Sequence, residues 1–269
     1  MTEEENPIPF TTAGQGPPVL CLPGFASGAW IFERVIEPLT PWFQLILPEN
    51  RGMGRAPPAE SPYALDDLAA DALGVMDRLG HRRFGVIGLS MGGFVAQLLA
   101  LRAPERLGAM ALLGTSSGGP EFARIFPLLP AEQVRNIYQM EATARIQAAL
   151  APTFCPLLQS FFPEVHGYIV QRRLEHEERL EQVMRQYDAV ERFLRHPLPL
   201  ERIAAPTLIL GGDQDRLVPP ANVDLLGSRI PGSERVHIAG TDHLFFLEKS
   251  AEVGERIREF FQRRWLGEI

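Results

Sequence analysis

Ser90 stands in the short stretch GLSMGG, residues 88–93. The glycines two positions away on either side, in the pattern G-x-S-x-G, permit a tight turn between a strand and a helix, which lifts the serine hydroxyl to the carboxyl edge of a sheet. A serine held there can attack a carbonyl carbon as a nucleophile. The same place also suits a plain helix N-cap, for which serine is a favoured residue.

The stretch also half-resembles a dinucleotide-binding loop, with Ser90 where a middle glycine would stand. Such a loop needs an acidic residue about 20 positions on, at the end of the following strand. Here that strand ends in ALLGTSSGG, residues 111–119, which contains no acid. The loop also normally occupies the first strand-to-helix turn, whereas Ser90 follows the third predicted strand. The residues therefore favour a nucleophile.

A nucleophilic serine needs a base. His243 lies in AGTDHLFFLE, in the loop after the last predicted strand, at the sheet edge where Ser90 is expected. His237 falls within that strand and is predicted to be a packed core residue, and His81 follows a helix end and is predicted to be solvated. The other three histidines fall in a long helical interval: His166, His176 and His196.

The base needs an acid that orients it, and GGDQDRLVPP offers two. Asp213 falls in the tight part of the turn, where an Asp side chain commonly bonds its own backbone two residues on. Asp215 follows the turn, so its carboxylate is predicted to point toward His243. Asp242 is a weaker candidate, because adjacent side chains in an extended loop tend to diverge.

Acyl transfer also needs donors for an oxyanion. LPGFASGAW, residues 22–30, follows the first clear strand. Gly24 lets the backbone turn so that the Phe25 N–H points inward, and the N–H of Met91 is the second predicted donor. The side chains of Phe25 and Trp30 are predicted to wall an apolar substrate pocket.

The elements that must position these residues alternate along the chain. Short apolar runs, apolar on both faces as in buried parallel strands, are separated by longer helical patterns, which predicts a doubly wound α/β sheet. The predicted strands are residues 18–23, 43–48, 84–89, 109–114, 206–212 and 234–240. The predicted helices are residues 65–79, 91–102, 220–230 and 251–265.

One interval, residues 119–197, contains no predicted strand and reads as helix throughout. It carries many of the aromatic residues of the chain, including Phe122, Phe126, Phe154, Phe161, Phe162 and Phe193. Its apolar face is therefore either plain packing or the roof of a pocket. We predict a core formed by residues 1–118 and 198–269, with residues 119–197 inserted as a helical lid.

Composition excludes several classes of function. The formal net charge of -7 argues against a surface built for nucleic acid or an anionic membrane. The two cysteines, Cys21 and Cys155, form no metal-binding pattern, and no signal peptide or apolar span is visible. We expect no metal or other cofactor, no membrane or nucleic-acid partner, a small-molecule substrate and a cytoplasmic location.

Five segments in this order resemble the α/β-hydrolase superfamily. CLPGFASGAW is similar to its oxyanion loop HGxxxS, with Pro23 in place of histidine. PENRGMGRA is similar to DxRGxGxS, with Glu49 and Ala56 as departures. GLSMGG matches the nucleophile elbow, and GGDQDRLVP is similar to the acid loop. GTDHLFFLE is similar to the segment G-H-x-x-x-x-E, with Asp242 before His243. The chain order serine, aspartate, histidine is also that of the family.

The resemblance implies an α/β-hydrolase fold with a helical lid before the penultimate strand. The position before R-x-V-P carries the acid of this family, which implies Asp215. The branch of small carboxylesterases, enol-lactonases and acyl-carrier methyl-ester hydrolases is the most similar. It implies a serine hydrolase that cleaves a carboxylic ester or lactone of a small, largely apolar substrate through an acyl-enzyme. Serine at position 90 argues against the dehalogenases and epoxide hydrolases of this fold, which use a carboxylate nucleophile.

Three alternatives stay open on the sequence. A ligand receptor on the same fold can keep the three residues and turn over slowly or not at all. A perhydrolase would use the same residues. A proline-iminopeptidase-like aminopeptidase would need lid acids facing a substrate ammonium. Glu175, Glu177 and Glu178 are present, but the helix RRLEHEERLE is predicted to present a solvated face.

Overall fold

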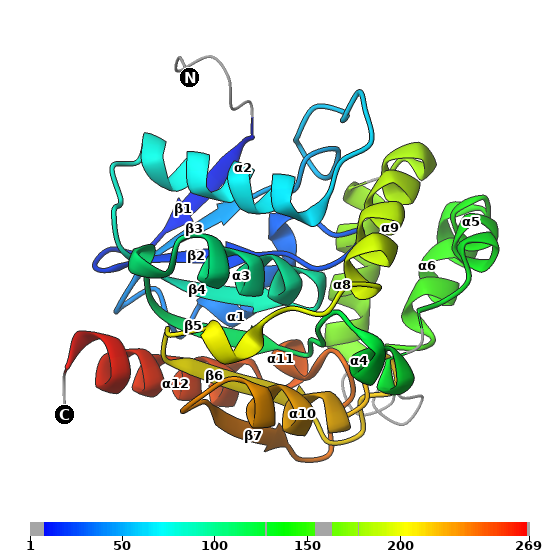
Figure 1. Cartoon of the computed structure of the whole chain (residues 1–269). Helices are drawn as coiled ribbons and strands as arrows, with labels where there is room; N and C mark the ends of the chain where they lie inside the picture. The colour runs from blue at the N-terminus through cyan, green and yellow to red at the C-terminus, as the bar shows by residue number, and fades with distance from the viewer. Residues whose placement is uncertain (1–7, 127, 154–162, 177, 268–269) are drawn as a thin grey trace.

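The structure is a computed structural model, and it describes residues 8–126, 128–153, 163–176 and 178–267. In these residues a seven-stranded sheet has the order β1-β3-β2-β4-β5-β6-β7 (Figure 1). All neighbouring pairs are parallel except β1 and β3, which are antiparallel. The strands are β1 (Phe10–Ala13), β2 (Pro18–Leu22), β3 (Gln44–Pro48), β4 (Phe84–Leu89), β5 (Leu107–Leu113), β6 (Thr207–Gly212) and β7 (Glu234–Ile238).

The strand order reverses direction beside β2. The chain runs from β2 outward to β3 and then returns to the other side of β2 to form β4. In an open α/β sheet, ligands bind in the crevice outside the carboxyl ends of the strands at such a switch point. The loop after β2 and the turn after β4, which carry Phe25 and Ser90, therefore meet at the place where this fold class binds ligands.

The six predicted strands are all present, but the sequence did not predict β1. This strand has four residues, FTTA, and its two central threonines are exposed, so no apolar run marks it. The prediction that every strand is buried on both faces is wrong for β7, because β7 lies at the edge of the sheet and is only partly buried.

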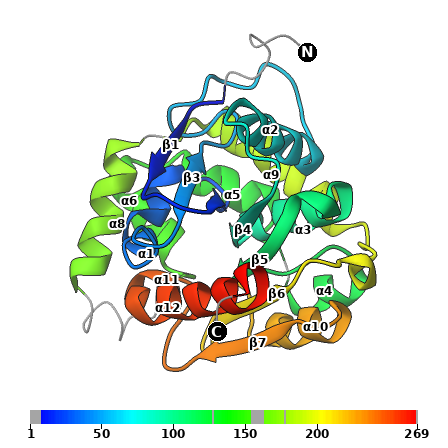
Figure 2. The same cartoon turned by 90° about the vertical axis from the view of Figure 1, so that its left-hand side faces the viewer.

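Helices cover both faces of the sheet (Figure 2). Successive strand residues face opposite sides, so Val86 packs in one apolar cluster and Ile87 in the other. One face is covered by α2 (Leu65–Arg78), α3 (Met91–Arg102) and α10 (Ala221–Arg229). The other is covered by α1 (Glu33–Ile36), α11 (Phe245–Glu248) and α12 (Ser250–Phe261).

A helical insertion separates β5 from β6, as predicted. Figure 1 shows α5, α6, α8 and α9 gathered beside one end of the sheet. Helix α4 contacts α10 of the core and also lines a hollow with the C-terminal end of α9. The domain boundary at residue 119 therefore stays a prediction. The helices of the insertion are α4 (Pro120–Ile125), α5 (Ala131–Tyr138), α6 (Ala142–Leu150), α8 (Pro163–Glu175) and α9 (Leu180–Leu194).

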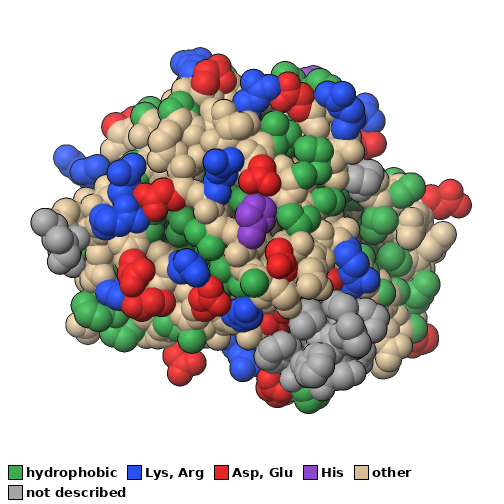
Figure 3. Space-filling model, turned by 90° about the horizontal axis from the view of Figure 1, so that it is seen from below, with side chains coloured by type: hydrophobic (Ala, Val, Ile, Leu, Met, Phe, Trp, Pro, Cys, Tyr) green, Lys and Arg blue, Asp and Glu red, His purple; other side chains and the backbone are tan. Residues whose placement is uncertain are grey.

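Charges of both signs are mixed over the face seen in Figure 3. Along the edge strand, Glu234 pairs with Arg263 at 2.8 Å, and His237 lies 3.3 Å from Asp224. Charged side chains on an edge strand discourage pairing with another chain. The prediction that His237 is a core residue is wrong, because the edge position of β7 leaves it exposed.

Within the described ranges, no helix combines the length and the apolar character that a bilayer crossing requires.

Candidate active site

Ser90 occupies the turn between the end of β4 and the start of α3 in a strained conformation. Its φ and ψ angles are 51° and -116°, a region that residues other than glycine rarely adopt, at a cost of roughly 1–3 kcal/mol. Hydrogen bonds hold this backbone. The Ser90 N–H donates to the Leu113 carbonyl at 2.8 Å, and the Ser90 carbonyl accepts from the Thr115 hydroxyl at 2.7 Å and from the Gly93 N–H at 2.8 Å.

The serine side chain does not act as a cap. Ser90 holds the N-cap position of α3, but its hydroxyl makes no capping hydrogen bond in the described part of the chain. The strain and the absent cap together argue that the turn serves to present the hydroxyl. Thr115, which fixes the Ser90 carbonyl, was not identified from the sequence because 25 residues separate the two.

The glycines of the motif are required by close backbone contacts. A Cβ on Gly92 would lie 2.0 Å from the Leu22 carbonyl oxygen, and a Cβ on Gly88 would lie 2.5 Å from the Gly92 carbonyl oxygen. Only glycine lets α3 approach the ends of β2 and β4 this closely. The approach brings the loop after β2 beside Ser90, since a Cβ on Gly24 would lie 3.5 Å from the Ser90 Cβ.

His243 and Asp215 form a buried pair. The His243 Nδ1 lies 2.8 Å from Asp215 Oδ2, and the two residues are 5% and 3% exposed. The other carboxylate oxygen, Oδ1, accepts hydrogen bonds from the backbone N–H groups of Leu217 at 2.9 Å and Val218 at 2.7 Å. A neutral imidazole that donates from Nδ1 keeps Nε2 as its acceptor. The pair can therefore present a proton acceptor in a fixed orientation.

The two other acids nearby have different partners. Asp242 is bound to the Arg216 guanidinium at 2.8 Å and to the His243 backbone N–H at 2.8 Å. Asp213 accepts from the backbone N–H groups of Gly240 at 2.8 Å and Thr241 at 3.3 Å. The prediction that Asp213 bonds its own turn is wrong: it ties β6 to the loop that carries His243, while Asp215 makes the short-range bonds.

The pKa of His243 is raised above its ordinary value. Burial alone lowers it, but the charge of Asp215, the hydrogen bond to Asp215 and the charge of Asp242 together outweigh burial. Glu248, the last residue of GTDHLFFLE, is also buried. Burial, and then the charge of Asp242, raise its pKa to about 7. Glu248 therefore changes protonation near neutral pH, and His243 stays protonated to a higher pH than an unperturbed histidine.

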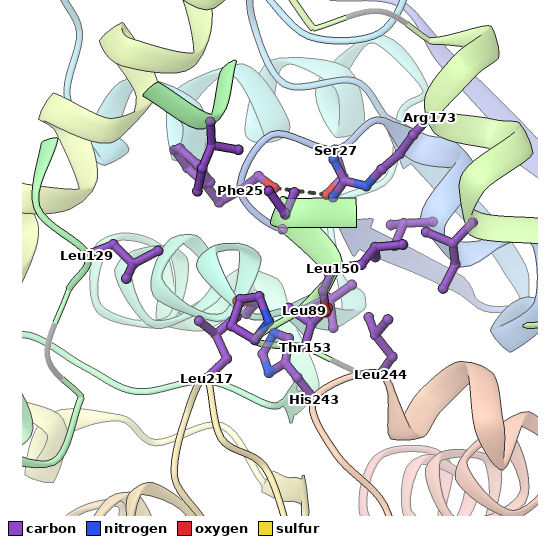
Figure 4. A pocket seen from close by; sticks show the side chains of 18 of the residues that line it. Phe25, Ser27, Leu89, Leu129, Leu150, Thr153, Arg173, Leu217, His243 and Leu244 are labelled. Carbon is purple, nitrogen blue, oxygen red and sulfur yellow. Dashed lines mark hydrogen bonds between the residues drawn. The ribbon is translucent and has the colours of Figure 1, made fainter. Parts of the chain in front are cut away.

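Ser90 and His243 line the same cavity, which has a volume of about 170 Å³. Figure 4 shows His243 among the side chains that line it. Gly24 and Phe25 of the loop after β2 also line it. The insertion supplies a largely aliphatic wall: Leu129, Val134, Ile137, Leu150 and Ile169. In the described residues, no hydrogen bond joins the Ser90 hydroxyl to His243. Catalytic hydrogen bonds are often long before substrate binds.

Aromatic side chains form less of the wall than predicted. Trp30 is not among the described lining residues. Its ring stacks on His176, with the ring centroids 6.4 Å apart, and contacts Tyr168, both on the insertion side. The described lid phenylalanines, Phe122, Phe126 and Phe193, pack in the core cluster of α3 instead. Tyr138 does line the cavity, and Phe154, Phe161 and Phe162 lie outside the described residues.

Arg173 brings one charged group to the wall of the cavity. Its Nη1 lies 3.6 Å from Glu178 Oε1, and both side chains are largely buried. Tyr138 lies beside the pair, and burial raises its pKa. The prediction of a solvated acidic face is wrong for Glu178, which is buried. Glu175 is exposed, and Glu177 lies outside the described residues.

The two predicted oxyanion donors belong to segments that border Ser90. Phe25 lines the cavity, and the N–H of Met91 belongs to the first turn of α3, where N–H groups have no partner within the helix. Glu49 supports the loop that carries Phe25, because its carboxylate accepts the Ala29 N–H at 2.8 Å. The departure from Asp at position 49 thus still provides a buried carboxylate beside this loop.

The described residues hold no cluster of three or more histidine, cysteine or acidic side chains that could bind a metal ion. Cys21 is buried in β2, and burial raises the pKa of its thiol. Cys155 lies outside the residues that the structure describes.

Comparison with known proteins matches most of the chain. Residues 17–250 match the sequence family described as alpha/beta hydrolase fold. The 2-hydroxy-6-oxononadienedioate/2-hydroxy-6-oxononatrienedioate hydrolase 2 of Pseudomonas putida is 30% identical over 243 residues, 88% of this chain and 84% of that protein. The poly(3-hydroxyalkanoate) depolymerase of Ectopseudomonas oleovorans is 27% identical over 254 residues, 91% of this chain and 84% of that protein.

A solved structure shows the same fold. The thermophilic esterase of Thermogutta terrifontis superposes with a TM-score of 0.81 and 25% identity, covering 96% of this chain and 94% of the esterase.

Proposed function

Because the chain belongs to the family with the alpha/beta hydrolase fold, we propose that it is a serine hydrolase of small carboxylic esters or lactones. The observation that carries the proposal is one cavity lined by two groups of matched chemistry. These are Ser90, strained and without a capping bond, and His243, oriented by a 2.8 Å hydrogen bond to Asp215.

In the proposed reaction, the Ser90 hydroxyl attacks the ester carbonyl while His243 Nε2 accepts its proton. Asp215 stabilises the imidazolium that forms. The N–H groups of Phe25 and Met91 bind the oxyanion of the tetrahedral intermediate. The intermediate collapses as His243 returns the proton to the leaving alcohol. Water, deprotonated by His243, then attacks the acyl-enzyme, and the acid leaves as Ser90 regains its proton.

The cavity favours a small neutral substrate. Its wall is mostly aliphatic, and the charge of Arg173 is balanced by Glu178 at 3.6 Å. A substrate carboxylate would have to leave water and would meet a guanidinium that already has an acidic partner. The name of the Thermogutta esterase supports ester chemistry for a chain of this kind.

We expect kcat/KM for 4-nitrophenyl esters to rise with acyl length only for short chains. Each methylene that finds room adds up to ~0.8 kcal/mol, or about fourfold, until the cavity of about 170 Å³ is full. The matched comparison is 4-nitrophenyl pentanoate against the mono-4-nitrophenyl ester of glutaric acid, which has the same acyl length and a terminal carboxylate. The pentanoate should be hydrolysed at least about tenfold faster, which corresponds to ~1.4 kcal/mol.

The same panel separates the alternatives. Faster turnover of the glutarate half-ester would contradict the proposed neutral substrate. It would favour an acidic substrate, such as the dioates in the name of the Pseudomonas putida relative. A single slow acylation without turnover would indicate a receptor. Cleavage of aminoacyl arylamides in preference to esters would indicate an aminopeptidase. Peracid formation from an ester and hydrogen peroxide would reveal perhydrolase activity.

We expect kcat/KM to fall as the pH decreases. The apparent pKa of this acid limb should lie above the ordinary histidine pKa of about 6.5. The pKa of His243 is raised, so the ring stays protonated to a higher pH than a free histidine, and the imidazolium cannot accept the Ser90 proton. The measurement is kcat/KM from pH 5 to 9 with a substrate that does not ionise. A profile flat over this range with chemistry rate-limiting would contradict the role of His243. Glu248→Gln is the control, because the pKa of Glu248 is also near 7 and the limb should survive its removal.

A further inference from the structure

Ala26 is the second strained residue near the proposed oxyanion site. It directly follows Phe25, and its φ of 46° lies in the left-handed region that glycine favours. Ala26 and Ser90 are the non-glycine residues with positive φ among those the structure describes. Strain of this kind persists only where the surroundings hold the backbone in place.

Both polar groups of the peptide unit between Phe25 and Ala26 are bound. The Ser27 hydroxyl donates to the Phe25 carbonyl at 3.1 Å, the bond drawn in Figure 4. The Ala26 N–H donates to Gln186 Oε1 at 2.7 Å. Gln186 is 160 residues away in sequence, lies on α9 of the insertion and is fully buried. The insertion therefore contacts the backbone of the oxyanion loop directly.

The Gln186 amide is itself oriented. Its oxygen must face Ala26, because the Ala26 N–H needs an acceptor. The Gln186 amide nitrogen has no hydrogen-bond partner among the described residues, and neither has the hydroxyl of Tyr63, a buried residue just before α2 of the core. The bond from the Ala26 N–H is thus the hydrogen bond of this buried amide in the described part of the chain, and its acceptor is directed at one peptide.

We propose that Gln186 is a positioning residue for the oxyanion hole, through which the insertion sets the orientation of the Phe25 backbone. This inference rests on the proposed function. Without the acceptor on Gln186, the strained backbone at Ala26 can relax, and because Phe25 belongs to the same peptide unit, a shift of Phe25 would redirect its own N–H. A misdirected donor weakens binding of the oxyanion in the transition state more than it weakens binding of the substrate.

Gln182 provides a matched control. It lies one turn earlier on α9 and is also buried. Its side chain binds both polar groups of Ala59, accepting from the N–H at 2.9 Å and donating to the carbonyl at 3.2 Å. It therefore anchors the same helix to the core through the same chemistry, away from the oxyanion loop.

The test compares Gln186→Leu with Gln182→Leu. Loss of one oxyanion donor typically costs about 10²–10³ in kcat, so we expect misdirection of one donor in Gln186→Leu to lower kcat by about 10–100-fold, with KM within about threefold. Gln182→Leu should keep kcat within about threefold of wild type. Its melting temperature should fall by about as much as that of Gln186→Leu. The rate at which a fluorophosphonate labels Ser90 should follow the same order, because that reaction also places an anionic oxygen in the hole.

The outcomes distinguish the two proposals. Equal kcat and equal labelling rates in the two variants would overturn the role of Gln186 and leave the esterase proposal standing. A wild-type protein that is labelled at Ser90 but does not turn over esters would reject the proposed function, and the labelling rates would still test Gln186. No labelling of Ser90 would overturn both. If Gln186→Leu does not fold, Gln186→Met removes the same acceptor with a more adaptable side chain.

Discussion

Replacing Ser90 with alanine is expected to lower kcat for ester hydrolysis by about 10⁵–10⁶-fold. Removal of the nucleophile of a comparable serine protease costs about 2 × 10⁶, because the remaining residues cannot act without it. The fold should be retained, since the bonds that hold this turn involve the Ser90 backbone and not its hydroxyl. The measurement is steady-state kinetics on 4-nitrophenyl butyrate, with circular dichroism to verify folding.

Ser90→Gly tests whether the strain at this position serves the hydroxyl. Glycine adopts a φ of 51° without the backbone strain that alanine has there. Ser90→Gly should therefore be more stable than Ser90→Ala by about 1 kcal/mol, and the two variants should be equally inactive. A fluorophosphonate should label one peptide of the wild-type protein, the one that contains Ser90. Full activity in either variant, or a label on another serine, would reject the nucleophile.

The inner strands of the sheet could be predicted because they are buried. Strands such as β4, whose six residues are all buried, are continuous apolar runs between turn-forming residues. Strand β1 has no such run, because it lies at the edge and pairs with β3 on one side only. His237 was misassigned for the same physical reason, since an edge position cannot be identified from an apolar pattern alone.

The candidate site was predictable where fold topology places residues at one edge of the sheet. Ser90 follows β4, Asp215 follows β6 and His243 follows β7, so parallel strands bring all three to their carboxyl ends. Partners supplied by the tertiary fold were not predictable. The contact of Gln186 with Ala26 joins residues 160 apart, and the packing of Trp30 against His176 joins the core to the insertion.

Asp215→Asn is expected to lower kcat by about 10⁴ without unfolding the protein. An asparagine amide keeps an oxygen that can accept the Leu217 and Val218 N–H groups, so the turn should survive. It carries no charge to stabilise the His243 imidazolium, and with its NH₂ facing Nδ1 it favours the wrong tautomer. The corresponding change in a serine protease costs about 10⁴. The measurement is kcat for the purified variant on the same ester.

Asp213→Asn is the matched control, two residues away in the same loop. Its carboxylate bonds the backbone of Gly240 and Thr241 and does not touch the His243 ring, and asparagine keeps one oxygen for those bonds. We expect kcat within about tenfold of wild type and a stability loss of about 1 kcal/mol.

The pH profile provides an independent check. Without the Asp215 charge, the pKa of His243 should fall, because burial then outweighs the remaining attraction to Asp242. The acid limb of the residual activity of Asp215→Asn should therefore lie at lower pH than that of the wild type. If Asp213→Asn is the less active of two folded variants, the orienting acid is Asp213.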